Sequence, residues 1–146
     1  MKEIVFTVAT PQDRIPIEQL LSNAKLPFTD LITHLPHFVV GRKNNEVIGV
    51  IGLEILGEIA LLRSLAVTGS YQGKGLSQIL YEKILDHAKL QQVKTLYVLT
   101  TTAEDYFDKR GFLKIQRSEA PESIKATKQF SGLCPASAVC LVKDIQ

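Results

Sequence analysis

The sequence has 146 residues and a mass of 16.2 kDa, which predicts one domain over residues 1–146 built around a single core. Hydrophobic residues make up 45% and charged residues 22% of the chain, so the composition excludes long disordered segments. The formal net charge is only +2, which gives no sign of a nucleic-acid partner. Residues 47–67 are the most apolar stretch, but glycine, glutamate and arginine interrupt them, which excludes a membrane-spanning helix.

The N-terminal residues and the two cysteines bear on the cellular compartment. Residues 1–6 carry an acid early and no small-residue cleavage site, so they do not resemble a signal peptide. We therefore expect a cytoplasmic protein in which Cys134 and Cys140 stay reduced as two small buried side chains. Their spacing, without nearby histidines, matches no zinc pattern, and we expect no metal.

The first forty residues predict a strand, a helix and a loop. Residues 4–8 have the composition of a strand, and Thr10-Pro11-Gln12-Asp13 reads as a helix capping box with proline at the first helical position. Pro16 is the alternative helix start. Prolines bracket the loop over residues 25–36, in which we expect one short helix around residues 30–33.

An antiparallel meander follows. Residues 38–40 and 47–55 read as strands separated by the polar turn at 42–45. A second turn at 56–58 leads into a further strand over residues 59–67.

The next segment changes from meander to strand–helix–strand order. A glycine-containing turn over residues 68–77 leads directly into a helix, and residues 95–100 then read as a buried strand. This order predicts a right-handed parallel crossover. The apolar stripe of the helix is Leu76, Ile79, Leu80, Ile84 and Ala88.

The last third alternates short helices and strands. Residues 102–105 are expected to cap a helix that stops at Gly111, and Pro121 to open another. Strands are expected at residues 112–116 and 138–142. The fold class that follows is α/β (α+β), with a mixed, mostly antiparallel central sheet of six to seven strands and helices on both faces.

The turn Gln72-Gly73-Lys74-Gly75-Leu76-Ser77 is a candidate anion site. Backbone N–H groups at a helix N-terminus lack intrahelical partners, and glycines let the backbone approach a diphosphate closely. Lys74 lies between the glycines with no Ser or Thr directly after it, which excludes a Walker loop, and Gln at position 78 excludes the dinucleotide-binding fingerprint. A tight strand–helix turn without a ligand stays open as the alternative.

The combination of Leu65-Ala66-Val67, this turn, the helix, the strand Leu96–Thr100 and a helix that ends at Lys109-Arg110-Gly111-Phe112 resembles the GNAT superfamily of N-acetyltransferases over nearly the whole chain. The acetyl-CoA signature of that superfamily is matched at Gln72 and Gly75, with Ser77 as a mild departure. Within the superfamily the chain is similar to the amino-acid acetyltransferases and to the subgroup named for arsenic resistance. The segments that carry this likeness are Leu35–Phe38, Gly52–Glu54, Ala60–Leu65, Leu99–Thr102 and Leu133–Cys140.

The resemblance implies that acetyl-CoA is the co-substrate. It implies that the pantetheine arm lies along the strand through backbone groups of Leu65 and Val67, with the Val67 N–H facing the thioester oxygen as a catalytic group. The coenzyme-binding residues expected on this basis are Leu65, Ala66, Val67, Gln72, Gly73, Lys74, Gly75, Leu76, Ser77 and Phe107.

The acceptor side is expected to involve Glu54, Arg63 and His37. Glu54 is the candidate general base, because burial at the end of an apolar strand disfavours a charged carboxylate, and it is also expected at the substrate. Arg63 could clamp a substrate carboxylate, and a structural salt bridge to Glu54 or Glu58 is the alternative. His37 lies in the acceptor-side loop, whereas His87 on the long helix is expected to be solvated.

One step of the family mechanism lacks its usual residue. Many relatives carry a tyrosine four residues before the Gly-Phe pair as the acid for the leaving thiolate, and here that position is Phe107. Water, Thr100, Thr101 or Tyr106 are the alternatives, and Thr100 is our candidate catalytic residue.

The sequence thus predicts transfer of an acetyl group to the amino group of a small molecule, an amino acid or a similar compound. The alternative is an acyl-CoA-binding module without catalysis. The expected partner is a small amine, with no nucleic acid and no membrane, and a homodimer is left open.

Overall fold

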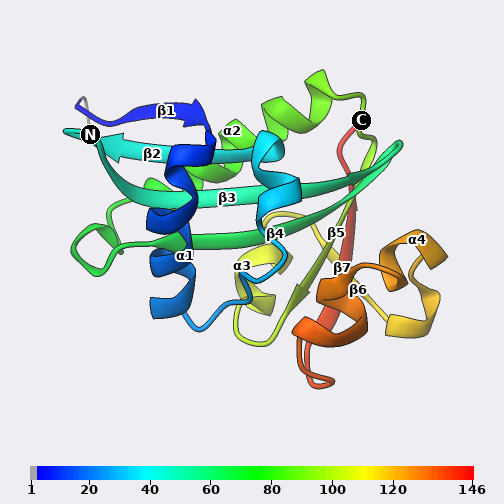
Figure 1. Cartoon of the computed structure of the whole chain (residues 1–146). Coiled ribbons are helices and arrows are strands. Elements are labelled where there is room, and N and C mark those ends of the chain that lie inside the picture. Colours follow the sequence, from blue (N-terminus) through cyan, green and yellow to red (C-terminus); the bar gives the residue numbers. More distant parts are fainter. Residues whose placement is uncertain (1–2) are drawn as a thin grey trace. The chain divides into compact units, whose positions relative to one another are not determined.

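The computed structural model describes residues 3–146 (Figure 1). Its strands are β1 (Val5–Val8), β2 (Phe38–Lys43), β3 (Glu46–Leu56), β4 (Ile59–Val67), β5 (Thr95–Thr100), β6 (Leu113–Ile115) and β7 (Val139–Asp144). Its α-helices are α1 (Arg14–Asn23), α2 (Leu76–Leu90), α3 (Glu104–Asp108) and α4 (Glu122–Lys125). Short 3-10 turns precede α1, β2 and α2, at Pro11–Asp13, Ile32–His37 and Gly69–Tyr71.

The strands form a seven-stranded sheet in the order β1-β2-β3-β4-β5-β7-β6. The β4–β5 pair is parallel, as the crossover through α2 predicts, while β1–β2, β2–β3, β5–β7 and β6–β7 are antiparallel. This arrangement confirms the mixed, mostly antiparallel sheet expected from the sequence.

The chain divides into two compact units. Unit 1 comprises residues 1–53 and 64–87, and unit 2 comprises residues 54–63 and 88–146. The single domain expected over residues 1–146 stays a prediction.

In unit 1 one face of the strands packs on α1. Phe38 and Val40 on β2 share a buried cluster with Val50 on β3 and with Ile17 and Leu21 on α1. The register places Phe38 opposite Gly52 and Val40 opposite Val50, so all four lie on one face.

The other face of the same strands packs on α2. A Cβ atom built on Gly49 would lie 2.9 Å from Leu80 Cδ1 and 3.2 Å from Leu76 Cδ2. Gly49 precedes Val50 and therefore faces the opposite side of β3, which places α1 and α2 on opposite faces of unit 1 (Figure 1).

The capping box that the sequence predicts forms at the 3-10 helix Pro11–Asp13, which leads directly into α1. The Thr10 N–H donates to Asp13 Oδ2 at 2.8 Å, and the α-helix begins at Arg14 rather than at Pro16. Arg42 on β2 binds the same carboxylate through both terminal nitrogens, at 2.6 and 2.8 Å, and this hydrogen bonding lowers the pKa of Asp13. The first turn of the helix is thereby tied to the sheet.

Unit 2 has its own core around β5 and β7. Leu61 on β4, Ile124 on α4 and Cys140 on β7 are buried together. Arg117 orders the segment before β7: its terminal nitrogens donate to the carbonyls of Phe130, Pro135 and Ala138 at 3.0 to 3.2 Å.

Three local predictions differ from the structure. The short helix expected at residues 30–33 is a 3-10 helix at Ile32–His37, and β2 runs on to Lys43 instead of stopping at residue 40. The helix that residues 102–105 are expected to cap begins at Glu104, with Ala103 as its N-cap residue, and Thr100 Oγ1 accepts from the Ala103 N–H just before it. Among the described residues, no helix combines the length and apolar character that crossing a membrane requires.

Candidate functional site

The glycine turn before α2 has the backbone geometry that the sequence requires of it. Gly73 has a φ of 76° and Gly75 a φ of 83°, in the left-handed region that side chains other than glycine rarely adopt. A Cβ atom on either glycine would meet nothing within 4 Å. Backbone conformation, and not crowding, therefore explains the two glycines, and the space above the turn is accessible to a ligand.

Helix α2 begins directly after these glycines. Its first residue Leu76 is buried, Ser77 is half-buried, and the first hydrogen bond into the helix runs from the Ile79 N–H to the Gly75 carbonyl at 3.3 Å. By helix geometry the N–H groups of the first turn have no acceptor within the helix. The buried Leu76 side chain belongs to the core, so any contact of Leu76 with a ligand must use its backbone.

Gln72 closes the turn back onto the end of β4. Its Nε2 donates to the Val67 carbonyl at 3.0 Å, and the Thr68 N–H donates to the Ile48 carbonyl on β3 at 2.9 Å. The side-chain amide that the sequence assigns to the coenzyme therefore has a structural contact of its own, and Oε1 is the atom left to face solvent or ligand.

Strand β4 pairs with β5 along only part of its length. Its parallel pairing with β5 covers Ile59–Leu62 and, among residues 3–146, extends no further. Two residues later Ser64 has a φ of 64°, which kinks the strand. Leu65 and Val67 follow half-buried, whereas Ala66 belongs to the core of unit 1.

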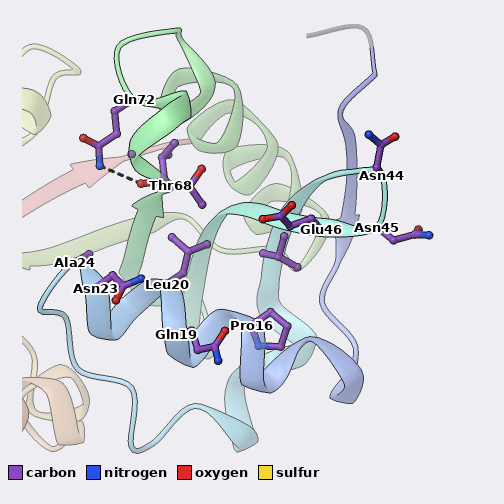
Figure 2. A pocket seen from close by; sticks show the side chains of 13 residues that line it. Pro16, Gln19, Leu20, Asn23, Ala24, Asn44, Asn45, Glu46, Thr68 and Gln72 are labelled. Carbon is purple, nitrogen blue, oxygen red and sulfur yellow. Dashed lines mark hydrogen bonds between the residues drawn. The ribbon is translucent and has the colours of Figure 1, made fainter.

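A pocket of about 720 Å³ lies in unit 1 beside the turn (Figure 2). Figure 2 shows side chains from α1 and from the β2–β3 turn along it, with Thr68 and Gln72 at one end. Amide groups dominate the lining, and of the described residues that form it Glu46 is the only charged one. The amide-bearing residues are Gln19, Asn23, Asn44, Asn45 and Gln72.

In unit 2 the two candidate acceptor residues are paired with each other. Arg63 Nη1 lies 3.6 Å from Glu54 Oε1, and the two side chains are 1% and 11% exposed. Of the two readings that the sequence left for Arg63, the ion pair is the one present here. A substrate carboxylate that reached Arg63 would therefore share it with Glu54.

Thr100 and Phe107 have structural contacts in unit 2. Thr100 Oγ1 accepts hydrogen bonds from the N–H groups of Thr102 and Ala103, at 3.3 and 2.9 Å, in the turn that precedes α3. Phe107 is buried and packs edge-to-face on Phe112, with ring centroids 5.2 Å apart. The Thr100 oxygen is occupied as an acceptor while its own proton stays available for donation.

His37 pairs with a residue fifty positions away. His37 Nδ1 lies 3.0 Å from His87 Nε2, and burial, with a smaller effect of His37, lowers the pKa of His87. The expectation that His87 is solvated is wrong, because its ring is half-buried and in contact with His37. The pairing leaves His37 Nε2 as the nitrogen for any other partner.

Sequence reasoning missed Asp30, Lys43 and Tyr71 of unit 1, which lie close to residues that it had singled out. Asp30 is buried in the loop before β2, and one of its carboxylate oxygens lies within 4.8 Å of a ring nitrogen of His34. Lys43 and Lys74 both approach the ring of Tyr71, each with Nζ 5.7 Å from the ring centroid. Neither set follows a motif; only the bracketing prolines marked the loop that holds Asp30.

The cysteines take no part in these arrangements. Cys140 is buried, and burial raises the pKa of its thiol to about 11, which makes it an inert core residue. Cys134 is half-buried and its thiol donates to Gln129 Oε1 at 3.4 Å.

Comparison with known sequences finds relatives that transfer acetyl groups. The chain is 29% identical to the amino-acid acetyltransferase of Escherichia coli strain K12 over 115 residues, which is 75% of this chain and 25% of that protein. It is 28% identical to an uncharacterized N-acetyltransferase of Chlorobaculum tepidum over 96 residues, or 65% of this chain and 61% of that one. The chain thus spans about a quarter of the length of the amino-acid acetyltransferases that it matches.

Solved structures share the fold. N-acetylglutamate synthase from Neisseria gonorrhoeae, in complex with coenzyme A and N-acetyl-glutamate, has a TM-score of 0.83 at 21% identity and covers 98% of this chain and 35% of its own. A Mycobacterium tuberculosis protein in complex with CoA has a TM-score of 0.78 at 18% identity, and the match covers 96% of this chain and 98% of that one. The family model described as the acetyltransferase (GNAT) family matches residues 6–112, which include the meander, the glycine turn and α2, and the chain belongs to that family.

Proposed function

We propose that the protein transfers the acetyl group of acetyl-CoA to the amino group of an amino acid or of an amino-acid-like compound. Membership of the GNAT family supports the reaction type, and the likeness to amino-acid acetyltransferases supports the class of acceptor. The observation that carries the proposal is the turn before α2, where two glycines with positive φ lead into the N-terminus of a fifteen-residue helix.

The residues of the turn fit a diphosphate. The unfilled space over Gly73 and Gly75 lets phosphate oxygens approach the backbone, and the positive end of the α2 dipole favours an anion there. Lys74 between the two glycines is exposed and adds a cation. In this proposal the backbone N–H groups from Gly73 to Ser77 bind the diphosphate, while Gln72 holds the turn closed through the Val67 carbonyl.

The end of β4 is the proposed track of the pantetheine arm. The arm can pair with backbone groups of Leu65 and Val67, because the pairing of β4 with β5 stops at Leu62 and the strand kinks at Ser64. The Val67 N–H then donates to the thioester carbonyl oxygen and stabilises the negative charge that develops on it.

On the acceptor side Glu54 is the proposed base. Its carboxylate takes a proton from the acceptor ammonium, directly or through a water molecule, so that the neutral nitrogen can attack the thioester carbon. Arg63 fixes the orientation of this carboxylate through the 3.6 Å ion pair and also attracts the carboxylate of an amino-acid acceptor. His37 stays a proposed contact of the acceptor through Nε2.

The departing thiolate needs a proton, and Phe107 cannot supply one. Thr100 is the proposed source, because its oxygen already accepts two backbone hydrogen bonds and its O–H is the remaining polar function. A water molecule held by Thr100 would serve the same purpose. This weak acid makes a second function worth testing, a module that binds acyl-CoA without catalysis.

The first experiment is a thiol-release assay with acetyl-CoA and pooled free amino acids, followed by the individual acceptors. We expect release that depends on an acceptor, and a fall of about 10²- to 10⁴-fold in kcat for Glu54→Gln. Saturable CoA binding without any thiol release across the acceptor pool would favour the non-catalytic module instead.

Arg63→Gln separates the two roles of Arg63. Each active amino acid is compared with its decarboxylated amine; a carboxylate clamp predicts loss of activity with the amino acid alone, whereas an effect through Glu54 predicts equal loss with both. Because the Glu54–Arg63 pair is buried, CoA affinity is measured for both variants to verify that they are folded.

A further inference from the structure

Two histidines of unit 1 join elements that lie fifty residues apart in the sequence. His37 ends the 3-10 helix Ile32–His37, directly before β2, and His87 lies in the last turn of α2. His37 Nδ1 is 3.0 Å from His87 Nε2. The ring centroids are 5.3 Å apart, which is close to this distance plus the span from each nitrogen to its own ring centre. The two nitrogens therefore point straight at each other, in the geometry of a single N–H···N hydrogen bond.

The number of protons on the two rings decides whether this bond can exist. A neutral imidazole carries a proton on one nitrogen and accepts at the other, so a neutral pair holds one proton in the bridge and one on an outer nitrogen. A third proton occupies the remaining outer nitrogen and leaves the bridge intact. A fourth proton must enter the bridge, where both facing nitrogens then carry an N–H and neither can accept. The doubly charged pair therefore loses the contact.

Repulsion between two imidazolium rings acts in the same direction. Both side chains are half-buried, where two like charges repel more strongly than in bulk water. Burial, and to a smaller extent the charge of His37, lowers the pKa of His87 from its ordinary value of 6.5. Neither of these two causes involves a carboxylate that could stabilise the second positive charge.

The charged groups that α2 and β1 present near the pair are exposed. Lys83 lies one turn before His87, and its Nζ is 5.9 Å from the centroid of the Phe6 ring on β1. Strand β1 itself carries no titratable side chain. The other charged residues of α2 within a turn or so of His87 are exposed and screened by water; they are Glu82, Asp86 and Lys89.

On the side of His37, the charged groups are few and mostly bound elsewhere. His34 is the other titratable residue of the 3-10 helix Ile32–His37 and lies one turn before His37. The charged residues of β2 are at its far end, where Arg42 binds the Asp13 carboxylate. The response of the pair to protons is thus set by the two rings themselves.

We propose that His37 and His87 form a proton-operated latch between the loop before β2 and the last turn of α2, which is closed while the two rings share up to three protons and is opened by the fourth. The latch is closed at neutral pH, and the two segments separate in mildly acidic solution. The loop that the sequence assigns to the acceptor thereby becomes responsive to pH. This inference concerns the fold of unit 1 and does not depend on the proposed acetyl transfer.

The direct test is an NMR titration of the ring nitrogens in the unmodified protein from about pH 8 to pH 5. The chain has three histidines, so the signals are few, and His37→Gln and His87→Gln assign them. We expect the signals of His37 and His87 to report two coupled steps, one of them below the ordinary histidine range, and His34 to titrate in a single step. In His87→Gln the signal of His37 should revert to one step. Independent single-step curves for His37 and His87 in the unmodified protein would overturn the inference.

A double-mutant cycle in urea measures the same proton as a change in stability. The unfolded chain takes up the fourth proton more readily than the folded protein, so stability falls as the pH decreases below 6.5. Since one proton is excluded, the effect on the unfolding equilibrium constant is at most about tenfold for each pH unit. The coupling between His37→Gln and His87→Gln should stabilise the protein at about pH 7.5 and vanish or reverse at about pH 5. A coupling that does not change with pH would contradict the latch.

His34→Gln is the matched control, because it removes the third histidine from the same loop and should leave the coupling between His37 and His87 unchanged. Amide hydrogen exchange then locates the opening. After correction for intrinsic rates, residues 34–38 and 84–90 should lose protection in acid while β3 keeps it, and His87→Gln should abolish this pH dependence. Equal changes at all amides, or none, would refute a local latch. If the variants do not fold, the titration of the unmodified protein decides alone.

Discussion

Replacement of the glycines in the turn by alanine tests the backbone conformation on which coenzyme binding depends. Gly75 has a φ of 83°, and a Cβ atom at this position meets nothing within 4 Å, so Gly75→Ala adds no steric contact with neighbours. The left-handed conformation itself costs a residue with a Cβ about 1–2 kcal/mol. The lower entropy of the unfolded chain returns about 0.4–1 kcal/mol, which leaves a net loss of about 1 kcal/mol.

The net loss for Gly75→Ala lowers either the stability of the protein or its affinity for CoA, depending on whether the turn keeps its shape. If the turn keeps its shape, the free energy of unfolding falls by about 1 kcal/mol and CoA affinity is retained. If the turn relaxes to negative φ, stability is retained but N–H groups no longer point at the diphosphate, and CoA affinity falls about tenfold for each charge-assisted hydrogen bond lost. Urea unfolding and titration calorimetry with CoA measure the two quantities on the same samples.

Gly69→Ala is the matched control. Gly69 also has nothing within 4 Å of a built Cβ, but its φ is outside the left-handed range, so the substitution should leave both measurements unchanged or raise stability slightly. Gly73→Ala, at a φ of 76°, should behave like Gly75→Ala. If all three variants gave the same stability and the same CoA affinity, the conformational argument for the turn would be refuted.

Two further predictions concern the stability of unit 1. Gly52→Ala would bring a Cβ atom into the fully buried Phe38 ring, so we expect the free energy of unfolding in urea to fall by about 1–3 kcal/mol. Phe38→Leu in the same chain should restore part of this loss. An unchanged free energy of unfolding would contradict the packing described for this face. Arg42 lowers the pKa of Asp13, so the ion pair should stabilise the fold at every pH above the ordinary value of 3.8 and be lost as pH falls below it. The stability difference between the unmodified protein and Asp13→Asn, about 1.5–3 kcal/mol at pH 6, should therefore shrink towards pH 3, and a difference independent of pH would refute the assignment.

The sequence alone predicted the elements that depend on local preference. The strands at Ile59–Val67 and Thr95–Thr100 have the predicted bounds, because apolar and β-branched residues continue up to turn residues on each side. The glycines of the turn also report a local property, since a positive φ is a matter of one residue and its neighbours. The order of strand, glycine turn, helix and strand along the chain was sufficient to predict the parallel crossover and the resemblance to the family.

Local chemistry was ambiguous where neighbouring residues could do the same work. Thr100 and Thr102 both carry a hydroxyl close to the start of α3, and in the structure it is the Thr100 oxygen that accepts from the N–H groups of Thr102 and Ala103. The bounds of the short helix in the loop were ambiguous in the same way. It was expected at residues 30–33, whereas the 3-10 helix spans Ile32–His37 and includes Pro36.

Contacts between distant residues were decided by the tertiary structure. His37 meets His87, and Lys43 approaches Tyr71, because the packing of α2 and its preceding turn against unit 1 brings together positions that no motif connects. The choice between an ion pair and an open guanidinium at Arg63 likewise depended on the hairpin that brings Glu54 within 3.6 Å of it. Backbone preference acts over a few residues and can be read along the chain, whereas pairing and burial of side chains depend on strand register and helix packing, which many residues determine together.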